Sequence, residues 1–328
     1  MKALVLEAKY SPFVIKDQEI PALEKDEVLI KIHSAAFNHR DLWIQKGMYG
    51  GLKYPCVLGS DGSGIVEKIG ESVDKELLNK EVIINPGMNW GNNEKVQNKD
   101  FKILGLPDEG TFAEYVKVDK KYVYDKPKNL SFEEASAIPL AGLTAYRALF
   151  SRADLQKGDK VLVTGIGGGV ALFAFQFALA FGAEVYVTSG NDGKIAKAIE
   201  MGAKGGVNYK NENWAKEFKI NFDVIIDSAA GDGFAKLIDL ANIGGRIVFF
   251  GGTKGTINDI NPQKVFWKQL SVLGSTMGSD KEFGKMINFI ENNKIKPVID
   301  GVFKYEQAQQ AIERMEKADQ FGKIVLNF

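Results

Sequence analysis

A glycine cluster between an apolar strand pattern and a long apolar helix pattern constrains the fold of this chain most. Residues 160–190 read KVLVTGIGGGVALFAFQFALAFGAEVYVTSG, so a strand, a glycine-rich turn, a helix and a second strand follow one another. Glycine has no Cβ, so backbone N–H groups can approach a pyrophosphate at the helix N-terminus, where the helix dipole favours negative charge. This order predicts a dinucleotide-binding βαβ unit. The contacts expected in the loop are Gly165, Gly167, Gly168, Gly169 and Val170.

Two other interpretations of the glycine cluster stay open. A glycine-rich turn can serve only to reverse the chain, and the same kind of loop can hold FAD. The strands and the helix around the cluster favour a nicotinamide dinucleotide over both.

The end of the second strand indicates which nicotinamide dinucleotide is bound. NAD-specific sites place an Asp or Glu there to accept hydrogen bonds from the ribose 2′-hydroxyl, whereas this strand ends in Thr188, Ser189 and Gly190. Ser189 can donate to a 2′-phosphate and Lys194 can supply positive charge. We therefore expect NADPH, with Tyr209 as a further cofactor contact. The alternative is that Lys194 is a solvated helix residue, as Asp192 beside it would allow.

Hydrophobic periodicity divides the chain into two lobes, as its 328 residues suggest. Short β-like runs fill residues 1 to about 120, and alternating strands and helices then indicate a parallel sheet until about Asn261. A helix over residues 281–294 and a last strand over 322–328 are expected to return to the first lobe. The predicted domains are 1–122 with 263–328, and 123–262. The polar segment Trp90 to Asp108 is expected to be an exposed loop.

Composition excludes several classes of function. The chain has 42 basic and 42 acidic residues, so no net charge attracts nucleic acid or an anionic membrane surface. Its single cysteine, Cys56, rules out an intrachain disulfide and any cysteine-rich zinc site. The N-terminus lacks the apolar core of a signal peptide, and the longest apolar stretch is too short to span a bilayer. We expect a cytoplasmic enzyme that acts on a small molecule.

Many segments together carry a resemblance to a known family. They include FNHRDLWIQKGMY, PCVLGSDGSGIVEKIG, IPLAGLTAYRAL, the glycine loop, FDVIIDSAAG, GGRIVFFGG and FGKIVL. In this order they resemble the medium-chain dehydrogenase/reductase superfamily, and more closely its zinc-free quinone oxidoreductase-like branch. The resemblance implies an α/β protein with a GroES-like, β-rich catalytic domain and a Rossmann coenzyme domain built on a doubly wound parallel sheet. It also implies a homodimer, with a tetramer as the alternative.

The sequence departs from the zinc-dependent alcohol dehydrogenases, which are similar over the same segments. Where they place a cysteine, a histidine and a third ligand that is commonly cysteine, this chain has Asn38, Ser60 and Leu140. An amide, a hydroxyl and an alkyl group do not meet the needs of a catalytic zinc ion. His39 and Asp61 remain as possible ligands, but two scattered residues rarely make a site. We therefore predict no metal.

Chemistry without a Lewis acid favours acceptors that delocalise charge by conjugation. We therefore expect NADPH-dependent hydride transfer to a quinone or an α,β-unsaturated carbonyl compound. One-electron and two-electron reduction of a quinone, and saturation of an enone, all stay open. The alternatives are a zinc-type alcohol dehydrogenase with unusual ligands and a non-catalytic NADPH-binding protein.

The resemblance also assigns the remaining site residues. Asn38 and Tyr49 would donate hydrogen bonds to the acceptor oxygen, and Asp41 would orient its neighbours. Tyr49 could instead relay a proton, and the alternative for it is an exposed loop tyrosine without a role in the reaction. Lys323 resembles a family lysine that closes over the cofactor, with a plain surface charge as the alternative. The residues expected at the nicotinamide end of the cofactor are Thr144, Phe250, Gly251 and Gly252.

Overall fold

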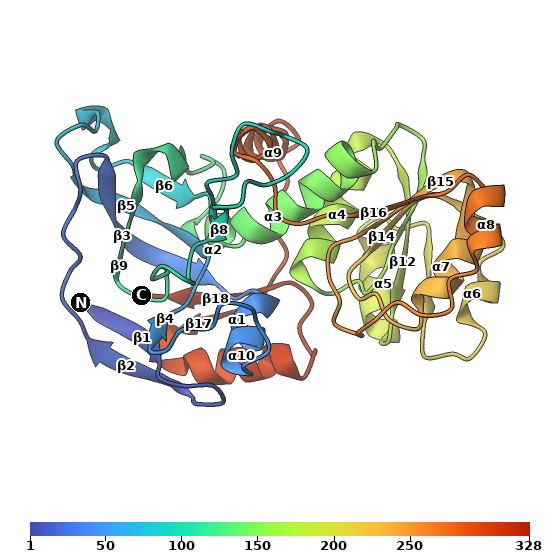
Figure 1. Cartoon of the computed structure of the whole chain (residues 1–328), viewed down its shortest axis with the longest axis horizontal. Coiled ribbons are helices and arrows are strands. Elements are labelled where there is room, and N and C mark those ends of the chain that lie inside the picture. Colours follow the sequence, from blue (N-terminus) through green and yellow to red (C-terminus); the bar gives the residue numbers. More distant parts are fainter. The chain divides into compact units, whose positions relative to one another are not determined.

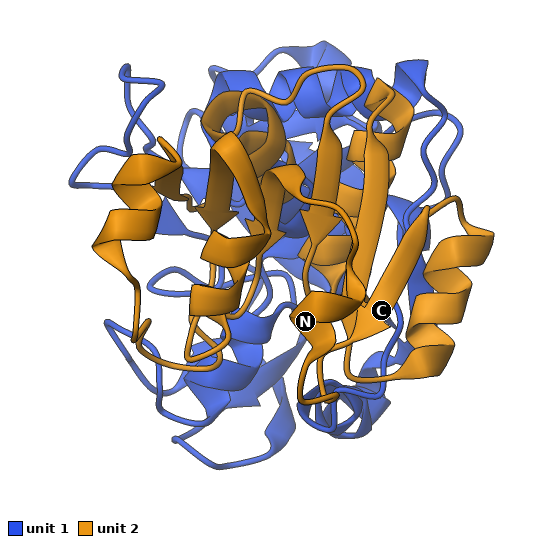
Figure 2. Cartoon of the chain, turned by 90° about the vertical axis from the view of Figure 1, so that its right-hand side faces the viewer, with its two compact units in different colours: residues 1–143, 278–328 blue, residues 144–277 orange.

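The chain, described over residues 1–328 in a computed structural model, divides into two units, the second inserted into the sequence of the first (Figure 2). Unit 1 comprises Met1–Leu143 and Gly278–Phe328, and unit 2 comprises Thr144–Met277. None of the helices combines the length and the apolar character that a membrane span requires.

Mostly antiparallel strands build unit 1. The largest sheet has the order β10-β6-β5-β3-β18-β17, with β9 also paired to β3, and only β17 and β18 run parallel. Its strands are β3 (Glu27–Ala36), β5 (Asp61–Ile69), β6 (Glu81–Ile84), β9 (Tyr115–Asp119), β10 (Val123–Asp125), β17 (Ile299–Lys304) and β18 (Lys323–Asn327). A three-stranded sheet has the order β2-β1-β4, and β7 pairs with β8. These strands are β1 (Lys2–Leu6), β2 (Phe13–Asp17), β4 (Cys56–Val57), β7 (Gly87–Met88) and β8 (Lys102–Ile103).

Short helices complete unit 1. They are α1 (His39–Gln45), α2 (Phe132–Ser136), α9 (Asp280–Asn292), α10 (Ala308–Glu316) and the 3-10 turns Lys75–Leu77, Lys120–Tyr122 and Tyr305–Gln307. The boundary between the two units falls inside helix α3 (Pro139–Tyr146). A capping box formed by Ser131 and Glu134 begins α2. Helix α2 packs against β3 and β5, where the Ser63 hydroxyl donates to the Phe132 carbonyl at 2.6 Å.

A six-stranded parallel sheet forms the centre of unit 2. Its order is β13-β12-β11-β14-β15-β16, which reverses direction between β11 and β14, the switch point where doubly wound sheets bind ligands. Figure 1 labels β12, β14, β15 and β16 of this sheet. The strands are β11 (Lys160–Val163), β12 (Glu184–Ser189), β13 (Gly205–Asn208), β14 (Phe222–Asp227), β15 (Ala241–Phe249) and β16 (Ser271–Gly274). The helices are α4 (Gly169–Phe181), α5 (Asp192–Glu200), α6 (Trp214–Glu217), α7 (Phe234–Leu240), α8 (Pro262–Trp267) and the π-helix Arg147–Arg152.

The unit boundaries differ from the domain ranges expected from the sequence, 1–122 with 263–328 and 123–262. Residues 123–143 join unit 1, because β10 pairs with β6 and α2 packs on the unit 1 sheet. Residues 263–277 join unit 2, because β16 extends the parallel sheet beside β15 beyond the point where the alternation appeared to end.

The segment from Trp90 to Asp108 is not simply an exposed loop, as the sequence suggested. Trp90, Leu104 and Leu106 are buried, and β8 lies within the segment. Trp90 at its start and the apolar run of residues 103–106 near its end anchor it to the core, although most residues between them are exposed.

Candidate active site

A buried cluster of Asn38, Asp61 and Lys323 lies where three elements of unit 1 meet. Asn38 is the N-cap residue of α1, Asp61 is the first residue of β5 and Lys323 is the first residue of β18. Strand β3 lies between β5 and β18, with Ala36 opposite both Asp61 and Val325. The chain leaves β3 directly into α1, so the sheet order brings the three side chains together.

The ammonium of Lys323 binds three oxygen atoms in this cluster. It donates to the Phe37 carbonyl at 2.7 Å, to Asn38 Oδ1 at 2.7 Å and to Asp61 Oδ2 at 2.9 Å. The side chain of Lys323 is 4% exposed and that of Asp61 is fully buried. A buried ion pair of this kind is tolerated only when further hydrogen bonds satisfy both partners, as they do here.

Asp61 is held from several sides. Its Oδ2 also accepts from Asn38 Nδ2 at 3.0 Å, and its Oδ1 accepts from the backbone N–H of Leu140 at 2.8 Å. The Thr111 hydroxyl donates to the Asp61 carbonyl at 2.7 Å. The carboxylate therefore has little freedom to turn.

Asp41 lies next to this cluster without joining it. Its Oδ2 accepts from the Asn38 backbone N–H at 2.8 Å and so caps α1, while its Oδ1 is buried with no partner. Burial raises the pKa of Asp41 to about 6, and the nearby Arg40 guanidinium opposes this shift. The pKa of the His39 imidazole is lowered. The protein atoms packed around the ring disfavour its charged form, and the positive charge on Lys323 disfavours it further.

Arg40 organises a second group that includes Tyr49. Its guanidinium donates to Ser60 Oγ at 2.7 Å and to the Leu104 carbonyl at 2.9 Å, and it lies 5.2 Å from the centre of the Tyr49 ring. The Ser60 hydroxyl donates to the Leu104 carbonyl at 2.8 Å. Sequence reasoning missed Arg40. Its only signal was a charged residue between the expected site residues Asn38 and Asp41, and it is 7% exposed.

The donor set at this place does not suit a zinc ion. Asn38 and Asp61 offer their oxygen atoms to the Lys323 ammonium, the Ser60 hydroxyl is bonded to Arg40 and Leu104, and Leu140 contributes only its backbone N–H. Nowhere in the chain do three or more His, Cys, Asp or Glu side chains form a group that could hold a metal ion. A cation is already bound to the oxygen atoms that a metal would need.

The expected cofactor residues of unit 2 follow the carboxyl ends of its parallel strands. The glycine loop follows β11 and leads into α4, with Gly168 as the N-cap residue. Gly165 and Gly167 have φ angles of 66° and 129°, which a residue with a Cβ rarely adopts. No atom lies within 4 Å of the place where a Cβ on Gly168 would be. This open cradle at a helix N-terminus fits a dinucleotide pyrophosphate.

Ser189, Gly190 and Tyr209 come together at the end of β12. Tyr209 donates its backbone N–H to the Ser189 carbonyl at 3.0 Å, and a Cβ on Gly190 would lie 2.9 Å from the Tyr209 hydroxyl. Lys194 lies in the first turn of α5, where the Asn191 side chain accepts its backbone N–H. Lys254, which sequence reasoning missed, places its ammonium 4.3 Å from the centre of the Tyr209 ring.

The residues predicted for the nicotinamide end lie at the same edge of the sheet. Phe250 follows β15 and donates its backbone N–H to the Asp227 carbonyl at 3.2 Å. A Cβ on Gly251 would lie 2.4 Å from the Ser228 carbonyl oxygen, so this close approach requires glycine. Gly252, the next residue, is exposed. Thr144 lies in α3, and its hydroxyl is 3.9 Å from the sulfur of Met277, which follows the end of β16 in the sequence.

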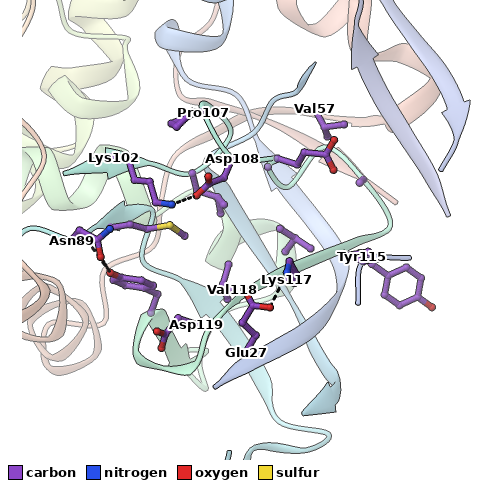
Figure 3. Close-up of a pocket in the computed structure, with 18 of the residues that line it drawn as sticks. Glu27, Val57, Asn89, Lys102, Pro107, Asp108, Tyr115, Lys117, Val118 and Asp119 are labelled. Carbon is purple, nitrogen blue, oxygen red and sulfur yellow. Dashed lines mark hydrogen bonds and ion pairs between the residues drawn. The ribbon is translucent and has the colours of Figure 1, made fainter. Parts of the chain in front are cut away.

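A separate cavity of about 540 Å³ opens in unit 1 (Figure 3). None of the predicted site residues lines it. Charged side chains beside it pair with one another, Lys102 with Asp108 at 2.5 Å and Lys117 with Glu27 at 2.9 Å. This cavity offers no group that points to a ligand.

Comparison with known proteins identifies relatives along the whole chain. The family model of the alcohol dehydrogenase GroES-like domain matches residues 24–128, and that of the zinc-binding dehydrogenases matches residues 169–292. A zinc-type alcohol dehydrogenase-like protein of Leptosphaeria maculans is 35% identical, over 97% of this chain and 95% of its own. The quinone oxidoreductase of Rattus norvegicus is 30% identical, over 96% and 94%. A solved structure titled as an NAD-dependent alcohol dehydrogenase superposes with a TM-score of 0.93 at 37% identity, over 100% of both chains.

Proposed function

Because the chain belongs to the medium-chain dehydrogenase/reductase superfamily, we propose that this oxidoreductase uses NADPH to reduce a quinone or an α,β-unsaturated carbonyl compound without a metal. The observation that carries the proposal is the cluster of Asn38, Asp61 and Lys323. It lies where zinc-dependent relatives are expected to hold their metal, and its oxygen atoms are bonded to an ammonium.

The acceptor must tolerate the arrival of a hydride without a Lewis acid. When bound, the nicotinamide supplies that hydride. A quinone or an enone spreads the incoming negative charge over a conjugated system, whereas a simple aldehyde concentrates it on one oxygen. Asn38 donates to this oxygen through an amide hydrogen, and Tyr49, which is partly buried beside Arg40, is the second expected donor.

The preference for NADPH is supported by the end of β12. The strand does not end in a carboxylate that would repel a 2′-phosphate, and Asp192 at the start of α5 accepts a hydrogen bond from Asn208. Ser189, Tyr209 and Lys194 are the proposed partners of the 2′-phosphate. One relative of known structure is titled NAD-dependent, so the proposed preference for NADPH would distinguish this chain from that relative.

A Lys194→Ala variant measures the cofactor preference. Lys194 is proposed to bind only the group that distinguishes the two cofactors, so we expect the variant to bind NADPH about tenfold or more weakly and NADH almost as before. Titration of intrinsic fluorescence with each cofactor gives both dissociation constants. An equal loss for both cofactors would remove the argument for NADPH.

A panel of acceptors tests the reaction itself. NADPH oxidation with product analysis would compare naphthoquinones, enones and simple aldehydes on the same preparation. We expect turnover with a conjugated acceptor and little with the aldehydes. Turnover of simple aldehydes alone would favour an alcohol dehydrogenase, and tight NADPH binding without any turnover would favour a non-catalytic binding protein.

We further propose that the chain forms a homodimer through the β16 edge of unit 2. Strand β16 ends the sheet order, so one of its sides has no neighbour. Trp267 and Ile243, from neighbouring elements of the same unit, are 81% and 82% exposed. A second copy of the chain would cover these apolar side chains and complete the hydrogen bonding of the edge.

A further inference from the structure

We propose that Lys323 and Asp61 are positioning residues that lock the Asn38 carboxamide in one orientation, so that it presents an N–H and not its carbonyl to the acceptor. This inference rests on the proposed function and adds a reason why the donor points one way. It gives Lys323 a different role from the cofactor contact that the family resemblance implies.

The two partners of the amide select its orientation. A carboxamide has nearly the same shape after a half turn that exchanges its oxygen and its nitrogen. In this structure Oδ1 lies 2.7 Å from the Lys323 ammonium and Nδ2 lies 3.0 Å from Asp61 Oδ2. A half turn would place the NH₂ group against the ammonium and the oxygen against the carboxylate. Both contacts would become repulsive, so the ion pair excludes the turned amide.

A count of hydrogen atoms identifies which group can donate to a ligand. The Lys323 ammonium has three hydrogens and three oxygen partners within 2.9 Å, so it has none left. Asn38 Nδ2 has two hydrogens and gives one to Asp61, which leaves one without a protein partner. The donor for an acceptor oxygen is therefore the amide, and the ammonium acts through it.

The partners are themselves fixed. The Leu140 backbone N–H holds Asp61 Oδ1 at 2.8 Å, and the Phe37 carbonyl accepts from the Lys323 ammonium at 2.7 Å. Asn38 is 6% exposed and Lys323 is 4% exposed, so little water competes for these bonds. An amide held in this way needs no reorientation when charge develops on the acceptor oxygen.

A Lys323→Met variant tests this role. It removes the ammonium that would repel the NH₂ group of a turned amide but keeps a long side chain, so Asp61 alone then selects the orientation and the turned amide becomes populated. We expect kcat with a conjugated acceptor to fall about tenfold to a hundredfold, by analogy with the loss on mutating residues that orient the ligands of a metal site. The dissociation constant for NADPH should stay unchanged, and Lys323→Arg should restore part of kcat. An unchanged kcat, or a loss confined to NADPH binding, would overturn the proposal.

Lys126 provides a matched control. Its side chain is 7% exposed and pairs with Glu81 at 3.1 Å in the same unit, outside the cluster. Lys126→Met should leave kcat unchanged, and an equal fall in both variants would overturn the proposal by indicating a general loss of structure. If Lys323→Met does not fold, Asp61→Asn takes its place, because a neutral amide there no longer repels the oxygen of a turned Asn38 and leaves Lys323 alone to select the orientation. An unchanged kcat in that variant would contradict the proposal.

A measurement without turnover separates this inference from the proposed function. In protein with isotope-labelled asparagine, the Asn38 side-chain signal is identified by its loss in Asn38→Ala. Its carboxylate-bonded hydrogen should resonate downfield of its partner, and this difference should shrink in Lys323→Met. An unchanged signal would refute the locked amide. Failure of the wild-type chain to reduce any acceptor would instead refute the proposed function and leave this result standing.

Discussion

Asp41 is a buried carboxyl that makes stability depend on pH. Its pKa is raised to about 6 because burial disfavours the charged form, and only one of its two oxygen atoms has a hydrogen-bond partner. The folded chain therefore binds a proton at Asp41 more tightly than the unfolded chain does. The stability gained from this proton is present below about pH 4 and is lost as the pH rises through about 6.

An Asp41→Asn variant should remove this pH dependence. The amide oxygen can still accept from the Asn38 backbone N–H, but it does not titrate. The pKa shift corresponds to at most about 3 kcal/mol of stability, which the wild type loses between pH 4 and pH 7. The loss in the free energy of unfolding over this range should therefore be smaller in the variant than in the wild type, by up to that amount. Urea unfolding at both pH values measures it. Asp100→Asn, at an exposed position, is the control, and equal pH dependence in Asp41→Asn and wild type would contradict the argument.

Cys56 should react slowly in the folded chain. It is half-buried, and burial raises the pKa of its thiol to about 11, so very little reactive thiolate exists at pH 8. We expect a chromogenic disulfide reagent to modify it slowly in buffer and rapidly in urea. Equal rates in both conditions would show that the thiol is accessible and ionised.

The sequence predicted part of this site at the level of residues. Asn38, Asp41 and Tyr49 share one segment, so a resemblance over that segment was enough to name them. Asp61 was considered only as a metal ligand and Lys323 as a cofactor contact. Their ion pair joins residues 262 positions apart and depends on β3 lying between β5 and β18, which residue patterns do not reveal.

At the scale of elements, the glycine loop between β11 and α4 was the most predictable feature. Strand, turn, helix and strand appear in the order that the periodicity indicated. The limits of the parallel sheet were harder to predict. β16 is a short, exposed edge strand, so it lacks the apolar run by which the inner strands were recognised. Trp90 was missed as a core residue because polar residues follow it in the sequence, and Leu104 because it belongs to a short apolar run at the end of a mostly polar segment.

A Gly167→Ala variant tests the role of the loop. The φ angle of 129° strains any residue with a Cβ, so the free energy of unfolding should fall by about 1 to 3 kcal/mol. NADPH binding should weaken as well, because the loop must approach the pyrophosphate. Gly158 has a φ of 83° in the turn before β11, at the other end of the strand, and Gly158→Ala should lose stability alone. Equal NADPH affinity in the two variants would count against the loop as the coenzyme site.

At the scale of the whole molecule, the apolar surface of unit 2 predicts the oligomeric state. Trp267 is 81% exposed in α8, and Val272 is 36% exposed in the edge strand β16. Large apolar side chains at an unpaired edge favour association with another copy of the chain. Light scattering after size-exclusion chromatography should give the mass of a dimer for the wild type and of a monomer for Trp267→Asp.

Tyr10 supplies the control for this prediction, because its side chain is 70% exposed in unit 1, away from β16 in the sequence and in a different unit. Tyr10→Asp should leave the dimer intact. A wild-type monomer, or a Trp267→Asp dimer at micromolar concentration, would show that the β16 edge is not the interface.

The most direct test of metal-free hydride transfer is to measure zinc content and NADPH oxidation on one preparation, before and after dialysis against a chelator. With a naphthoquinone as the acceptor, we predict far less than one zinc atom per chain and the same rate before and after dialysis. Activity that falls as zinc is removed and returns when zinc is added would contradict the account.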